Sequence, residues 1–122
     1  MKRIAFASIL FLCVAAASLS AQSYEWKQIT AIESVVPGGL GRSRLISSDA
    51  SGQVVEKDLE NFFSFVGINF KNVLNNDKVI SERIQEMSDG GWELHQVVPG
   101  VYSADKSTGI FITRYIFRRA KK

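Results

Sequence analysis

Few residues in this chain could carry out chemistry. His95 is the only histidine, and the sequence offers neither a second imidazole nor a cysteine at metal-ligand spacing. No serine lies in a Gly-x-Ser-x-Gly nucleophile motif. Glu93 and Glu56 could act as paired carboxylates, but nothing in the sequence fixes the gap that such a pair requires. The sequence therefore predicts no catalytic residue, no metal site and no cofactor, although an enzyme is left open as an alternative.

The segment PGGLGRSR, residues 37–44, could bind an anion. Successive backbone N–H groups in such a glycine-rich segment can form a concave anion site. The arginines beside it, and those of the C-terminal end, have guanidinium groups that match carboxylates and phosphates. The candidate anion-binding residues are Gly39, Gly41, Arg42, Arg44, Arg118 and Arg119. The alternative is a flexible strand connection with arginines that only keep strand ends soluble, since the segment lacks the glycine and lysine pattern of nucleotide-binding loops.

The N-terminus is typical of a secretory signal peptide. Lys2 and Arg3 precede an apolar run from Ile4 to Ala17, and small residues follow this run. The run is shorter than the roughly 20 apolar residues of a membrane-crossing helix. We expect residues 1–21 to be removed and the protein to be exported, either to the periplasm or out of the cell, with no membrane span after cleavage. The alternative is that this segment stays attached as an uncleaved anchor.

Cleavage changes the composition of what remains. It takes away Cys13, the only cysteine, and with Lys2 and Arg3 it lowers the formal net charge from +3 to +1 (3 − 2). A net charge this small argues against nucleic acid as a partner. Residues 22–122 suffice for one domain, which must hold together without disulfides and has a basic C-terminal end.

Several segments of the remaining sequence predict strands. YEWKQITAIESVV, residues 24–36, is rich in aromatic and β-branched residues and predicts the first strand. SRLISS and QVVEKDL, residues 43–48 and 53–59, flank a turn and predict a β-hairpin. WELHQVV, residues 92–98, predicts a strand that the following Pro-Gly pair stops. IFITRYIFRR, residues 110–119, predicts a long last strand with isoleucines on one face and aromatic side chains on the other.

The clearest helix is predicted for residues 77–89. Its buried face is formed by Val79, Ile80, Ile84 and Met87. Asn75 or Asn76 is expected to cap the helix, and Gly90 to end it in a left-handed conformation. We expect Trp92 to fold back over the helix end and to be buried against the apolar face of the helix.

The Phe-rich segment ENFFSFVGINFKNVL, residues 60–74, has no clean apolar period. We expect a short helical turn and a packed loop in which its large apolar side chains find cover. All elements together predict an α+β fold, with a mainly antiparallel twisted sheet of four or five strands and one main helix packed on one face.

The order helix, GGWEL, strand, polar loop and a closing strand that ends in FRR resembles a small bacterial domain-of-unknown-function family. That family is marked by a Gly-Trp-Glu-Leu motif and a terminal strand with an aromatic residue, Lys or Arg, and Arg. The resemblance covers residues 24–119, and the long segment of residues 37–70 departs from the short family pattern. It implies a longer, secreted variant of the kind found in Bacteroidetes-like bacteria, and it carries a fold rather than a reaction.

The sequence favours a non-enzymatic protein-interaction or envelope-associated module that is secreted or periplasmic. Its expected partner is an unknown protein or a second copy in a homo-oligomer, with an anionic envelope polymer as a further candidate. The alternative is a small-ligand or anion-binding domain, or an enzyme with its site under residues 60–74.

Overall fold

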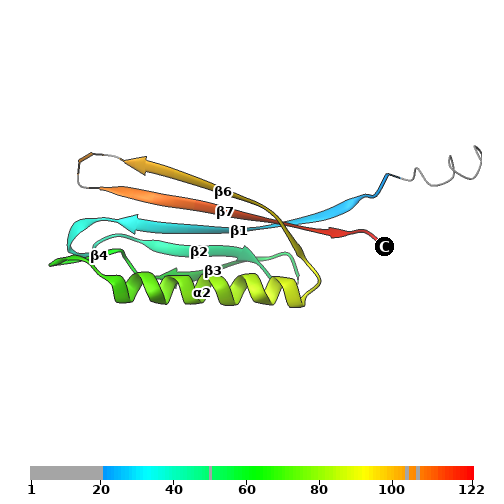
Figure 1. Ribbon diagram of the computed structural model, residues 1–122, viewed down its shortest axis with the longest axis horizontal. Coiled ribbons are helices and arrows are strands. Elements are labelled where there is room, and N and C mark those ends of the chain that lie inside the picture. Colours follow the sequence, from blue (N-terminus) through cyan, green and yellow to red (C-terminus); the bar gives the residue numbers. More distant parts are fainter. Residues whose placement is uncertain (1–20, 50, 104, 107) are drawn as a thin grey trace, which may run out of the picture.

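A computed structural model of the chain describes residues 21–122 except 50, 104 and 107 (Figure 1). The predicted signal peptide therefore lies outside the described residues, apart from its last position. In chain order the elements are β1 (Tyr24–Val35), the short 3-10 helix η1 (Pro37–Gly39), β2 (Ser43–Ser48), β3 (Val54–Leu59), β4 (Phe63–Ser64), β5 (Gly67–Ile68), α2 (Phe70–Asp89), β6 (Glu93–Ser103) and β7 (Gly109–Ala120). No helix in this described part of the chain is long and apolar enough to cross a membrane.

Five strands form one antiparallel sheet in the order β3-β2-β1-β7-β6. β1 lies at the centre and pairs with β7 over its whole length, from Tyr24 opposite Ala120 to Val35 opposite Gly109. The short strands β4 and β5 form a separate hairpin. Because α2 lies along one side of the sheet, the predicted α+β architecture with one main helix is confirmed (Figure 1).

The core lies between α2 and one face of the sheet. Successive strand side chains point to opposite faces, so every second residue of β1 and β7 faces the helix. The buried apolar residues are Ile29, Ala31, Leu45, Leu59, Ile80, Met87, Trp92 and Phe117. Tyr115 packs against this cluster from the same face of β7 as Phe117, and the isoleucines of β7 occupy the other face, as predicted.

The helix begins at Phe70, earlier than the predicted start at residue 77. Asn69 is its N-cap, since its side chain accepts a hydrogen bond from a backbone N–H at 3.3 Å. Asn76, one of the expected caps, is instead buried, and its amide binds the backbone N–H and C=O of Glu60 at 2.8 Å each. The start was missed because exposed and half-buried apolar side chains alternate in the first two turns, so that no single apolar face marks them.

The helix ends at the predicted glycine pair, but the second glycine is the left-handed one. Gly90 has a φ of −76° and Gly91 a φ of +78°. The backbone N–H groups of Gly90 and Trp92 donate to the carbonyls of Glu86 and Met87, at 3.0 Å each. This reversal turns Trp92 onto the core, where it is buried as predicted.

β6 continues through the Pro-Gly pair at 99–100 that was expected to stop it. Pro99 pairs opposite Thr113, and the ladder runs on to the end of the strand at Ser103. β6 is an edge strand, and a proline is tolerated there when the N–H that it lacks would face away from the neighbouring strand. The position at the edge, which the local sequence does not disclose, therefore overrides the usual effect of proline.

The expectation of a packed loop within residues 60–74 is wrong. The segment contains the hairpin of β4 and β5, which is held by only two residue pairs and turns through Phe65 and Val66. These two side chains are 93% and 96% exposed, whereas Phe62 and Phe63 are half-buried. The short hairpin projects from the sheet, so its turn lies beyond the reach of the core.

Candidate functional site

The residues considered for catalysis do not form one site, because Glu56 lies across the sheet from Glu93 and His95. His95 occupies a β-bulge in β6, and its ring meets the ring of Trp26 edge-on with 5.2 Å between centroids. Glu93 and Glu56 lie on β6 and β3, which are the opposite edges of the sheet and roughly 20 Å apart. In the described part of the chain, no group of three His, Cys, Asp or Glu side chains could hold a metal ion. Glu93 and Glu56 are therefore too far apart for joint acid–base work.

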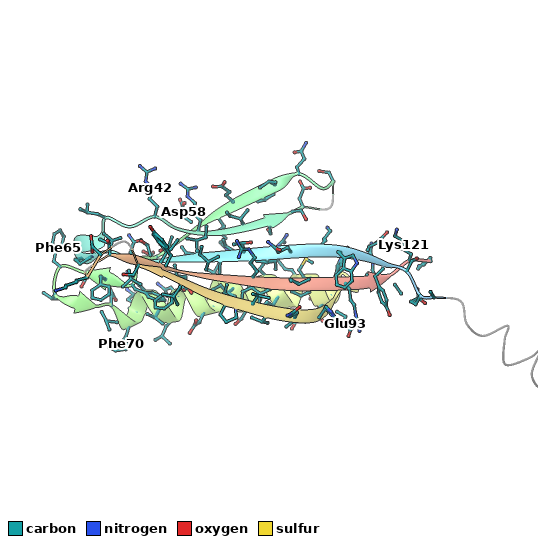
Figure 2. The ribbon with its side chains drawn as sticks, turned by 90° about the horizontal axis from the view of Figure 1, so that it is seen from above. Arg42, Asp58, Phe65, Phe70, Glu93 and Lys121 are labelled. Carbon is teal, nitrogen blue, oxygen red and sulfur yellow. The ribbon has the colours of Figure 1, made fainter. Side chains whose placement is uncertain are left out.

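The structure does not bring the two pairs of candidate arginines together. Arg44 lies opposite Ile32 of β1, and Arg118 lies opposite Trp26 of the same strand. These rows are about 20 Å apart at about 3.4 Å per residue. Figure 2 shows the same separation, with Arg42 near one end of the molecule and the C-terminal residues at the other. A single anion site built from all six candidate residues is therefore not formed.

Three of the four candidate arginines are bound by carboxylates. The pairs are Arg44 with Glu56 at 2.6 Å, Arg118 with Glu93 at 3.1 Å and Arg119 with Glu25 at 2.8 Å. The hydrogen bonds and charge of Arg118 hold the pKa of Glu93 below its ordinary value. Arg42 is exposed and has no carboxylate partner within the described residues. Of the candidate cations, Arg42 is thus the one still open to an external anion.

The glycine-rich segment packs against its neighbours. Gly38 and Gly39 have φ values of +76° and +70°, which side chains other than glycine rarely adopt. The Gly39 carbonyl accepts a hydrogen bond from Nδ2 of Asn61 at 2.8 Å. A Cβ atom on Gly41 would collide with Ser34 of β1. The geometry gives Gly39 and Gly41 a packing role, and anion binding by this segment stays a prediction.

Two cations lie over the ring of the buried Trp92. Nζ of Lys27 is 5.1 Å from the ring centroid, and Cζ of Arg119 is 4.4 Å from it. A cation over an indole face is attracted by roughly 0.5 to 2 kcal/mol, depending on its exposure to water. Sequence reasoning missed this contact because Lys27 and Arg119 are far apart in the chain and meet only through the pairing of β1 with β7.

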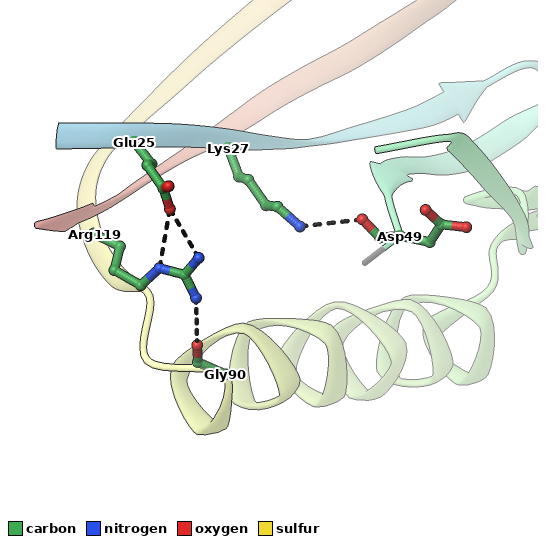
Figure 3. A network of polar contacts seen from close by, with 5 residues as sticks. All are labelled: Glu25, Lys27, Asp49, Gly90 and Arg119. Atoms are coloured by element: carbon green, nitrogen blue, oxygen red, sulfur yellow. Dashed lines mark hydrogen bonds and ion pairs between the residues drawn. The ribbon is translucent and has the colours of Figure 1, made fainter. Parts of the chain in front are cut away.

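The same two cations join the sheet to the helix end and to the β2–β3 hairpin (Figure 3). Arg119 donates to Glu25 at 2.8 and 3.2 Å and to the carbonyl of Gly90 at 3.3 Å. Nζ of Lys27 donates to the carbonyl of Asp49 at 3.1 Å. Gly90 follows the last turn of α2, where carbonyls lack helical partners and the helix dipole favours a cation. The network therefore stabilises the helix end.

An open cavity of about 630 Å³ borders this network, and Lys121 and Lys122 contribute to its lining. It is the basic C-terminal end that the sequence suggested for anion binding. However, all three guanidinium nitrogens of Arg119 already have acceptors in Glu25 and Gly90. An added anion would have to compete with Glu25 for them, so the geometry favours a structural role.

A partly buried polar cluster joins β1 to α2. Nδ2 of Asn76 donates to Oε1 of Glu33 at 3.2 Å. Burial raises the pKa of Glu33, the bond from Asn76 opposes this rise, and the charge of Asp77 adds to it. Burial also raises the pKa of Tyr115, with a contribution from Glu33. The ionised carboxylate of Glu33 is therefore disfavoured in the folded protein.

Eight of the ten large apolar side chains that are more than half exposed in the described part of the chain gather at one end of the molecule. We define the apolar end as Leu40, Phe65, Val66, Ile68, Phe70, Leu74, Val101 and Tyr102, each of which is more than half exposed. They come from the segment after η1, the β4–β5 hairpin, the start of α2 and the end of β6 (Figure 1). Figure 2 labels Phe65 and Phe70 at this end, and Lys121 at the other.

Contacts behind the apolar end hold its segments together. The ring of Phe62 contacts that of Phe111 with 5.6 Å between centroids, and the backbone N–H of Phe62 donates to the carbonyl of Ser34 at 3.1 Å. A mainly apolar cavity of about 340 Å³ lies between η1, β4 and the β6–β7 tip, where Pro37 and Phe63 face Val101 and its neighbours. The apolar end is thus a surface supported by several elements.

Sequence reasoning noticed the Phe-rich segment but expected it to be covered. The missing signal was spatial, because the end of β6 joins this segment only through the fold. Comparison with known proteins gave no further guide: no protein-family model, curated protein or solved structure matches the chain. The resemblance to the Gly-Trp-Glu-Leu family stays a prediction.

Proposed function

We propose that this protein is a non-enzymatic, envelope-associated module that binds a lipid surface through its apolar end. The observation that carries the proposal is the collection of highly exposed Phe, Val, Leu, Ile and Tyr side chains at one end of the molecule. Soluble proteins rarely expose a large contiguous apolar patch unless it binds a partner or a membrane. The signal-like residues 1–21 support an exported location, where such a surface meets envelope membranes.

The shape of the apolar end favours lipid over a protein partner. Phe65 and Val66 occupy the turn of a projecting hairpin and are almost fully exposed. Protein interfaces centre on anchors that are seated in complementary pockets. A convex turn with apolar side chains can instead enter the boundary between lipid headgroups and acyl chains, which lies about 5 to 10 Å deep. Burying one such side chain there contributes roughly 1.5 to 3 kcal/mol.

Cations flank the apolar end. Arg42 precedes β2, Lys71 lies in the first turn of α2, and Lys106 lies at the β6–β7 tip, and all three are exposed. Lys and Arg near an anionic membrane surface contribute about 1 kcal/mol each. Arg42 is the candidate anion-binding residue that has no carboxylate partner among the described residues, so a lipid phosphate would supply its anionic partner.

Vesicle binding by matched valine variants tests the proposal. The purified protein is sedimented with vesicles of phosphatidylcholine, alone or mixed with phosphatidylglycerol. Val66→Asp should lower the partition coefficient at least about tenfold, because it places a charge at the point of insertion. Val55→Asp, an equal change at an exposed valine of β3 away from the apolar end, should leave binding unchanged.

Binding should be stronger to the vesicles that contain phosphatidylglycerol, and Arg42→Ala should reduce that difference. If the unmodified protein does not sediment with either kind of vesicle, the lipid proposal is wrong. Binding that is equal in Val66→Asp and in the unmodified protein would assign vesicle binding to another segment, such as residues 4–17, and would also overturn the proposal.

A further inference from the structure

The sheet has a second face that none of the described helices covers. α2 packs on one side, and the strands lie in front of it when the molecule is seen from above (Figure 2). The uncovered side, which we call the open face, carries apolar side chains from four strands. They are Trp26 and Ile32 of β1, Ile46 of β2, Val54 of β3, and Ile110, Ile112 and Ile116 of β7. Val54 and Trp26 are 71% and 54% exposed.

Both edges of the sheet resist pairing with another chain. β6 contains a bulge at His95 and a proline at Pro99. β3 carries the charged residues Glu56, Lys57 and Asp58 in succession. Bulges, prolines and charges on edge strands are the usual means of blocking edge-to-edge association. The open face is therefore the part of the sheet available to a partner.

One row of side chains across the open face carries both an anionic and a cationic residue, so two copies of it can match each other in charge. The register places Glu56, Ile46, Thr30, Arg114 and Val98 side by side, from β3 to β6. Arg114 is exposed, and no described residue forms an ion pair or hydrogen bond with it. Glu56 lies three strands away from Arg114 in the same row and shares Arg44 with Asp58, at 2.6 and 3.8 Å.

We propose that a second copy of this chain packs face to face on the open face, with Arg114 of each copy bound to Glu56 of the other. The two copies are related by a two-fold axis that runs parallel to the strands and lies between β1 and β2. This axis places β7 of one copy over β3 of the other, and it leaves each row at the same position along the strands. Arg114 then lies over Glu56 of the second copy, and Ile46 lies over its Thr30. Arg44 stays paired with Asp58 when Glu56 turns to Arg114 of the other copy. Because the contact is isologous, the ion pair forms twice.

The next row supports the same arrangement. Val54 and Ile116 lie two residues from Glu56 and Arg114 along β3 and β7, on the same face and toward the same end of the sheet. The two-fold axis therefore places Val54 over Ile116 of the second copy. This contact gives one of the most exposed valines of the sheet an apolar partner. Sheets that pack face to face keep their strand directions within about 30°, which a two-fold axis along the strands permits.

The overlapping area is that of a weak interface. β2 and β3 are six residues long, so the four strands from β3 to β7 overlap over about 20 Å along the strands and about 19 Å across them. The product is about 380 Å² for each copy, or about 760 Å² in total, which is below the approximate 1,000 Å² of a stable interface and fits a dimer that forms at high protein concentration. This inference stands apart from lipid binding, because it uses a different surface.

Charge reversal tests the pair directly. Dissociation constants are measured by sedimentation equilibrium for the unmodified protein, Arg114→Glu, Glu56→Arg and the double variant. Each single reversal sets like charges against each other twice and should weaken association at least about tenfold. The double variant restores opposite charges and should return to within about threefold of the unmodified protein.

Lys57→Glu is the matched control, because it reverses a charge on β3 that points to the helix side of the sheet. It should leave the dissociation constant unchanged. Circular dichroism establishes that each variant is folded. A protein that stays monomeric at every concentration, single reversals without effect, or a double variant that fails to recover would each overturn the proposal.

Discussion

Trp92 joins the core to the charged network at the helix end. It packs with Ile80 and Met87 in the core, and Lys27 and Arg119 lie over its ring. Trp92→Ala removes the apolar contacts and leaves a cavity, so we expect a loss of about 3 to 5 kcal/mol in the free energy of unfolding. A urea titration followed by circular dichroism measures it.

The second tryptophan provides a control for this experiment. Trp26 is 54% exposed on the open face, so Trp26→Ala should cost much less than the change at Trp92. Equal losses at the two positions would mean that Trp92 does not hold the central place in the core described here.

Glu33 gives the stability of the protein a defined pH dependence. Its pKa in the folded protein is raised, mainly by burial, so the folded state holds the proton more tightly than the unfolded state. Stability then falls as the pH rises from the ordinary pKa of a glutamate through the raised value, and it stays lower at neutral pH. Glu33→Gln removes the charge and keeps an oxygen for Asn76. We therefore expect it to raise the melting temperature at pH 7.

The gain from Glu33→Gln should shrink as the pH falls, because the glutamate of the unmodified protein becomes protonated. Melting curves recorded between pH 3 and pH 7 compare the two proteins on this point. A gain that is the same at both ends of the range would trace the effect to packing of the amide and not to the carboxylate charge.

At the scale of elements, the start of α2 depends on one short side chain. Asn69 accepts a hydrogen bond from a backbone N–H in the first turn of the helix. Asn69→Ala should lower the free energy of unfolding by roughly 1 kcal/mol, the usual cost of losing an N-cap. Asn75→Ala changes an exposed asparagine inside the same helix and should have little effect. If Asn75→Ala proves the costlier change in a urea titration, the helix begins where the sequence pattern placed it.

The sequence predicted which strands and helices are present better than it predicted the residues at which they begin and end. β1, β7 and the β2–β3 hairpin follow from alternating β-branched and aromatic residues, and the structure has them within one residue of the expected limits, whereas β6 ends five residues later than expected. The errors occurred where tertiary position decides. Pro99 is tolerated because β6 is an edge strand, and the first turns of α2 lack a single buried face. Neither fact can be read from a local window of sequence.

The candidate sites were less predictable than the fold. Arg42, Arg44, Arg118 and Arg119 were grouped by residue type, yet sheet register separates the two pairs by about 20 Å. Arg114 and Glu56 lie in one row across the sheet only because the register of four neighbouring strands aligns them. The sequence disclosed which side chains were unusual, and pairing between distant strands decides which of them meet.

At the scale of the whole molecule, the two proposed contacts reinforce each other. The proposed two-fold axis is parallel to the strands, so the apolar ends of both copies point in the same direction. Two linked contacts with one lipid surface bind more tightly than either alone, because the second becomes intramolecular once the first has formed. Loss of the dimer should therefore weaken vesicle binding without abolishing it.

The central position of β1 also determines when the protein can fold. β1 is the first strand of the sheet and its longest ladder is with β7, the last, so the middle of the sheet joins residues at the two ends of the described chain. Contacts between such distant residues form late, because a long loop must close first. A chain emerging from a ribosome cannot complete its core until the residues of β7 are free. This strand order thus delays completion of the core until β7 has been synthesised.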